Sequence, residues 1–168
     1  DLARLPNDQT LIVSGTRAVY HATAPQIPNL LREIGRLRET SFRLVGEGTG
    51  NAIDLDEFDP YYHHLFIWDS KLQRVMGAYR MGATDEILPE RGKNGLYTST
   101  LFRYKTKLLK ELSPALELGR SFVHPDHQRS YGTLLMLWRG VGHYCLKYPR
   151  YKNLFGPVSI SNRYNSLS

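Results

Sequence analysis

The sequence predicts an α+β fold, an α/β sandwich in which helices flank a mixed, mostly antiparallel sheet. The first observation is the order of the segments, which reads β-α-β-β-β-(α)-β-α-β by hydrophobic periodicity. The second is the length of 168 residues with 41% hydrophobic residues, which suits one domain with a sizeable core. We therefore expect residues 1–168 to form a single domain.

A strand and a helix are predicted near the N-terminus. Residues 18–23 alternate enough for a strand, and residues 24–42 carry apolar side chains at helical spacing, with Pro25 and Pro28 near the start. Residues 43–62 then form a polar, glycine-rich connection of about twenty residues, a length that in a compact domain usually indicates function or disorder.

The middle of the chain predicts more strands. Residues 63–69 and 74–81 read as two strands joined by a hairpin turn, and residues 95–104 read as a third. Residues 105–112 predict a short helix.

The last elements predict a strand, a loop, a helix and a strand. Residues 115–123 form the strand and residues 131–148 a helix with a strong apolar face. Residues 153–160 predict a final buried strand.

The strand at 115–123 carries more charge than a buried strand should. Glu117 and Arg120 lie three positions apart, so strand alternation places them on opposite faces. Buried charges are rare unless they are paired or functional. We therefore expect one of the two to be buried or to lie in a cleft.

Charge and cysteine content narrow the class of partner and compartment. The net charge of +6 favours an acidic partner, such as nucleic acid, an anionic membrane surface, a phosphate-bearing cofactor or an acidic protein. The cations form short groups that solvated helix faces would also explain. The single Cys145 excludes an internal disulfide framework and favours a reducing cytoplasm. No apolar run approaches the roughly 20 residues of a membrane-spanning helix.

The loop from Val123 to Gly132 is a candidate anion site. It ends where a helix begins, and the free N–H groups of a helix N-terminus favour a phosphate. Arg129 would add a cation and Gly132 a close backbone approach, although the Walker pattern is absent. An ordinary strand–helix connection explains the same residues.

The segment "DLDEFD" gathers acidic residues in a basic protein. Its spacing fails the EF-hand pattern, so an ammonium substrate is the better functional interpretation, and a solvated loop is the alternative. The histidines at 63, 64, 124 and 127 match no zinc motif, and we expect no metal site.

Taken together, these residues are compatible with acyl transfer to an amine. Glu117 could deprotonate an ammonium nucleophile, directly or through a water. The strand's backbone could hydrogen-bond an extended cofactor arm.

Four short motifs, in order along the chain, resemble those of a known superfamily. "LRETSF" resembles an R-x-x-x-F motif and "DEFD" a D-x-x-D pair. "GAYRM" resembles G-x-x-R, and "ELGRSFV" resembles E-x-x-R-x-F. The set resembles the acyl-homoserine-lactone synthase branch of the GNAT N-acyltransferases. It is more similar to the ornithine-lipid and glycine-lipid N-acyltransferases, a group also labelled hemolysins. Their L-L-W-R-G motif is similar to "LLMLWRG" in this sequence.

The resemblance implies a GNAT-like fold and an acyl donor carried on phosphopantetheine, with no permanently bound cofactor. It implies a long acyl chain on acyl carrier protein, or on coenzyme A, transferred to the α-amine of an amino acid such as ornithine or glycine. Acyl carrier protein is acidic, which is compatible with the charge of +6. The implied product is an acyl-amino-acid lipid, made in the cytoplasm with membrane association left open.

The resemblance also assigns site residues. Its catalytic candidates are Glu117, as general base, and Arg120. The substrate-binding candidates are Arg38, Phe42, Asp56, Asp59, Arg80 and Phe122, and the cofactor-binding candidates are Gln128, Arg129 and Gly132. For the arginines the alternative is ion pairing with the aspartates, and for the phenylalanines it is plain core packing.

Two departures from the family pattern affect these expectations. The phosphate motif [QR]-x-x-G-x-[GA] has Leu134 at its last position, so a carrier-protein donor fits better than coenzyme A. The chain stops at Ser168, where the fold should continue, so we expect a fragment truncated at its C-terminus. Two other functions stay open: an acetyl-coenzyme A dependent N-acetyltransferase, and a non-enzymatic basic module, for which no nucleic-acid recognition motif is present.

Overall fold

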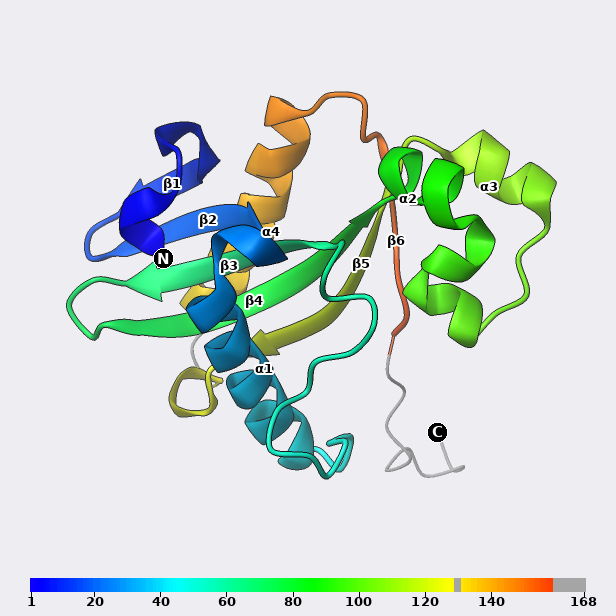
Figure 1. Ribbon diagram of the computed structural model, residues 1–168. Helices are drawn as coiled ribbons and strands as arrows, with labels where there is room; N and C mark the ends of the chain where they lie inside the picture. The colour runs from blue at the N-terminus through cyan, green and yellow to red at the C-terminus, as the bar shows by residue number, and fades with distance from the viewer. Residues whose placement is uncertain (129–130, 159–168) are drawn as a thin grey trace, which may run out of the picture.

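The computed structural model describes residues 1–128 and 131–158. These form a six-stranded sheet in the order β1-β2-β3-β4-β5-β6, with helix α1 on one face and helix α4 on the other (Figure 1). Neighbouring strands are antiparallel except for β5 and β6, which are parallel. The expected α+β sandwich with a mixed, mostly antiparallel sheet is confirmed.

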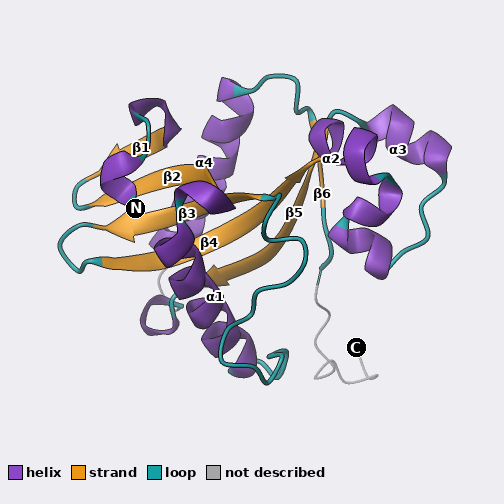
Figure 2. Ribbon diagram, in the orientation of Figure 1, coloured by secondary structure: helices purple, strands orange, loops and turns teal. Residues whose placement is uncertain are grey.

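Most predicted elements are present within a few residues of their expected bounds, including the hairpin between β3 and β4 (Figure 2). The elements are β1 (Thr10–Ser14), β2 (Arg17–Thr23), α1 (Pro28–Arg43), β3 (His63–Asp69), β4 (Arg74–Ala83), α2 (Thr84–Arg91), α3 (Thr106–Leu112), β5 (Ala115–Val123), α4 (Tyr131–Lys147) and β6 (Asn153–Phe155).

The predicted strand at 95–104 is wrong. The chain there forms a 3-10 turn, Tyr97–Thr100, and its backbone N–H groups at Tyr97 and Thr98 donate to the Glu117 carboxylate instead of to a neighbouring strand. A distant side chain thus overrides the local strand propensity. Helix α2 and strand β1 were not predicted, and β6 is shorter than expected, although 159 and 160 lie outside the described residues.

Each face of the sheet carries its own hydrophobic core. Leu137 and Val141 of α4 pack over β2, β3 and β4, and Gly140 lets the helix approach closely, because a Cβ there would lie 2.7 Å from Val19 Cγ1. Ile34 and Leu37 of α1 pack on the opposite face. A third cluster, containing Phe58, Tyr62, Ile87, Leu96 and Leu109, holds α2 and α3 beside β6 (Figure 1).

The long connection at 44–62 contains neither helix nor strand and is fixed by buried ion pairs. Arg38 of α1, 1% exposed, lies 2.8 Å from an Asp59 carboxylate oxygen and 3.1 Å from one of Asp54. Burial alone would raise the pKa of Asp59. The hydrogen bonds and positive charge of Arg38, together with the charge of Arg80, outweigh burial and lower it from 3.8 to about 2.

We expect Asp59→Asn to destabilise the fold by about 3–5 kcal/mol at pH 7, because it leaves buried arginine charge uncompensated. The folded pKa of Asp59 lies below 3.8, so its contribution is fully present above about pH 4 and is lost as pH falls through about 2. Denaturant unfolding across this range should show a flatter pH dependence in the variant than in the wild type.

Asp126→Asn is the matched control, because Asp126 is exposed and pairs with Arg74 at the surface. Its effect should stay below about 1 kcal/mol. Equal effects of the two substitutions would contradict the role given to the buried pairs.

Candidate active site

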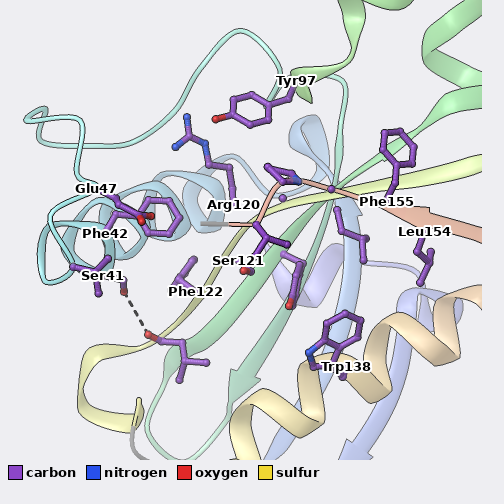
Figure 3. A pocket seen from close by; sticks show the side chains of 18 of the residues that line it. Ser41, Phe42, Glu47, Tyr97, Arg120, Ser121, Phe122, Trp138, Leu154 and Phe155 are labelled. Atoms are coloured by element: carbon purple, nitrogen blue, oxygen red, sulfur yellow. Dashed lines mark hydrogen bonds between the residues drawn. The ribbon is translucent and has the colours of Figure 1, made fainter. Parts of the chain in front are cut away.

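A cavity of about 810 Å³ opens where β5 and β6 separate. Their pairing ends at Glu117 and Phe155, and we call this point the apex of the cavity. Gly156 lies so close to the β5 backbone here that a Cβ built on it would be 2.0 Å from the Leu118 carbonyl oxygen. Figure 3 shows side chains of α1, β5, β6 and α4 around the cavity, including Ser41 and Trp138. Since α1 and α4 lie on opposite faces, the cavity joins the two faces of the sheet.

The side chains that line the cavity are mostly apolar and aromatic, and several of them are exposed to solvent. Leu101, Trp138 and Leu154 line it and are 52%, 49% and 44% exposed. Large exposed apolar side chains around one opening indicate a ligand or partner rather than a random surface.

A bulge in β5 forms one wall of the cavity. Arg80 pairs with Gly119 and Ala78 with Phe122, so β5 has one residue more than β4 over this stretch. The extra residue turns at Arg120, whose φ of 48° lies in the left-handed region. β6 pairs with β5 only up to Glu117, so the β5 edge beyond it borders the cavity.

The expectation that one of the two charges is buried is confirmed by Glu117, which is 1% exposed, but the bulge makes the expectation of opposite faces wrong. An extra residue breaks the alternation of faces, so Glu117 and Arg120 lie on the same side of the strand. Both contact Tyr97: Glu117 through the Tyr97 N–H at 3.2 Å, and Arg120 with its guanidinium 5.1 Å from the ring centroid.

The structure brings five of the predicted residues into one charge cluster. Arg80, 2% exposed, lies 2.5 Å from an Asp56 oxygen and 3.1 Å from one of Asp59. Arg120 lies 3.4 Å from oxygens of Asp54 and Asp56. With Arg38 they join β4, β5 and α1 to the connection at 44–62. The acidic loop therefore pairs with arginines of its own chain, which weakens its interpretation as an ammonium site.

Glu117 is 1% exposed and is satisfied by hydrogen bonds. It accepts from the Tyr62 hydroxyl, from the Tyr97 N–H and, at 2.5 Å, from the Thr98 N–H. Burial, and then the negative charge of Glu117, raise the pKa of Tyr62, which keeps its hydroxyl protonated as a donor. Glu117 does not line the cavity itself and contacts its wall through Tyr97.

The two predicted phenylalanines lie at the cavity. Phe42 lines the cavity, and the Arg120 guanidinium lies over its ring, 5.9 Å from the ring centroid. Phe122 is 5% exposed and packs in the core under α1, and it also lines the cavity. It therefore belongs both to the core and to the pocket wall.

Of the predicted cofactor-binding residues, one lines the cavity, one lies in α4 and one is outside the described residues. Gln128 lines the cavity, and its side-chain N–H donates to the Val123 carbonyl at 3.5 Å. Gly132 lies in the first turn of α4, and Arg129 lies outside the described residues. In residues 1–128 and 131–158, no group of His, Cys, Asp or Glu side chains is placed to hold a metal ion.

Sequence reasoning missed the partners of Glu117, namely Tyr62, Tyr97 and Thr98. They come from the end of the long connection and from a 3-10 turn, so no periodic pattern marks them. The sequence shows Asp54 only as the first acidic residue of "DLDEFD", because its pairing with Arg38 and Arg120 depends on tertiary structure.

Residues 37–139 match the acetyltransferase (GNAT) domain family. Glycine N(alpha)-acyltransferases of Phocaeicola vulgatus and Bacteroides thetaiotaomicron are 37% and 36% identical to the chain, over 88% and 97% of its length. The L-ornithine N(alpha)-acyltransferase of Rhodobacter capsulatus is 38% identical over 66% of the chain. The matched regions are 48%, 52% and 42% of these three relatives, so the chain spans about half their length. Because the family model matches more than half of its residues, the chain belongs to the acetyltransferase (GNAT) domain family.

Proposed function

We propose that this chain holds the acyl-transfer site of an N-acyltransferase that acylates the α-amine of an amino acid. The observation that carries the proposal is the apolar cavity between β5 and β6, with the β5 edge along its wall. An extended thioester arm can hydrogen-bond such an edge as an added strand does, while apolar side chains receive the acyl chain. The names of the glycine and ornithine acyltransferase relatives support an amino-acid acceptor.

The reaction needs little chemistry from the protein beyond positioning and proton removal. The acceptor is an ammonium at neutral pH, so a base must first take one proton to free the nitrogen lone pair. The nitrogen then attacks the thioester carbonyl carbon, the C–S bond breaks, and the sulfur leaves as a thiol with a second proton from the nitrogen, so that the amide keeps one N–H. Donors on the β5 edge can stabilise the negative charge that develops on the carbonyl oxygen.

The donor we favour is a long acyl chain on acyl carrier protein, with coenzyme A as the alternative carrier. The cavity of about 810 Å³ lies in the upper part of the ~300–1,000 Å³ range of ligand pockets, more than an acetyl group alone requires. The net charge of +6 favours an acidic carrier protein. The product would be an acyl-amino-acid lipid.

We also propose a cytoplasmic location with peripheral contact to an anionic membrane. The support is the charge of +6, a lipid product and a free Cys145 thiol, which suits a reducing compartment. No helix in the described part of the chain has the length and apolar character needed to cross a membrane.

We predict that the full-length protein, given palmitoyl and acetyl thioesters of both carriers, forms N-palmitoyl glycine or ornithine from the carrier-protein thioester. The reaction would be run with a panel of amino acids as acceptors, and mass spectrometry would identify the product. A reaction without acceptor measures simple thioester hydrolysis. Acetyl transfer from coenzyme A alone would replace the proposal by an N-acetyltransferase, and no product from any pair would contradict acyl transfer.

Glu117 is our candidate for the base. Because it is 1% exposed and does not line the cavity, we propose that the proton reaches it through a water. Glu117→Gln keeps an acceptor for the Thr98 N–H but removes the carboxylate. We expect kcat to fall about 100-fold or more. The glutamine amide group would face the Tyr97 N–H, so the melting temperature should also fall, and kcat is measured well below it.

Tyr62→Phe separates loss of the base from loss of a hydrogen bond, because it removes the hydroxyl that donates to Glu117 and leaves the carboxylate in place. A smaller fall in kcat than that of Glu117→Gln is expected. Turnover of Glu117→Gln within a few-fold of wild type would show that Glu117 only anchors the turn at Tyr97–Thr100.

A further inference from the structure

Gly119 stands in β5 without a structural reason to be glycine. A Cβ built at this position meets nothing within 4 Å, and its φ is not in the left-handed region. The adjacent bulge residue that does adopt a left-handed φ, where glycine is usual, is Arg120. Neither packing nor backbone conformation therefore requires glycine at 119.

Two glycines of β4 and the glycine directly after β6 differ in this respect. A Cβ at Gly77 would lie 2.7 Å from the Phe122 carbonyl oxygen, and one at Gly82 would lie 2.5 Å from the Tyr62 ring. At Gly156 it would lie 2.0 Å from the Leu118 carbonyl oxygen. Each of these three glycines is explained by a neighbouring group of the protein itself.

The empty space at Gly119 belongs to the cavity. Gly119 lines it, two residues beyond the last β5–β6 pair at Glu117 and Phe155. A molecule that passes from the α4 side to the α1 side crosses the sheet near this apex. Glycine inside a strand weakens the strand and often marks a place where a ligand approaches the backbone.

We propose that Gly119 determines how large an acyl group the site accepts, because the acyl chain passes over its Cα. The inference rests on the proposed acyl transfer and deepens it. A side chain at 119 would project into the passage, so longer acyl groups would be excluded before shorter ones.

The test is a series of Gly119→Ala, Gly119→Val and Gly119→Leu in the full-length protein. For each variant, kcat/KM is measured with acetyl, octanoyl and palmitoyl thioesters, together with the melting temperature. The ratio of palmitoyl to acetyl kcat/KM should fall stepwise with side-chain size, by roughly tenfold or more for leucine. The melting temperatures should stay close to that of wild type.

Gly142→Leu is the matched control, because Gly142 is exposed in α4, does not line the cavity and also has nothing within 4 Å of a built Cβ. Its ratio should equal that of wild type. An unchanged ratio in Gly119→Leu, or equal losses with all three thioesters, would overturn the role of Gly119 while acyl transfer stands. Absence of transfer by the wild type with every thioester would instead overturn the proposed function, and this inference with it.

Discussion

The site depends on the limited pairing of β5 with β6. Within the part of the chain that the structure describes, the two parallel strands share only the pairs from Ala115–Asn153 to Glu117–Phe155. Beyond them the bulge at Arg120 alters the course of β5, and the chain after β6 forms the opposite wall of the cavity. Continuous pairing would close the sheet, satisfy the β5 edge and remove the passage between its two faces. The cavity is thus a consequence of strand geometry and not of a loop placed over a finished sheet.

The buried charge cluster supports this geometry. A left-handed φ at a residue other than glycine costs roughly 1–2 kcal/mol, and Arg120 makes ion pairs with Asp54 and Asp56 that offset this cost. The same aspartates hold the connection at 44–62 close to β4 and β5. Two residues of this connection, Val45 and Glu47, line the cavity. These charges therefore act first on the shape of the site, and any part they play in substrate binding comes through that shape.

Regular elements were predictable where packing follows a period. α1 and α4 each bury one face, so Ile34 and Leu37, or Leu137 and Val141, recur at helical spacing. The residues near the site were recognised by motif, but their arrangement was not, because the bulge at Arg120 leaves no mark in the alternation of β5. The sequence around Tyr97–Thr100 predicts a strand and not the observed turn, since the Glu117 carboxylate that orders the turn lies far away in sequence.

The most direct test of the account is amide hydrogen exchange with and without a palmitoyl thioester. The account predicts that binding slows exchange in 118–123 of β5 and in 154–158, where the chain leaves the sheet, because the ligand covers the β5 edge. Protection confined to the second, acidic hollow at α2, which Tyr61, Glu86 and Glu90 line, would contradict it. So would binding that leaves exchange in the β5 edge unchanged.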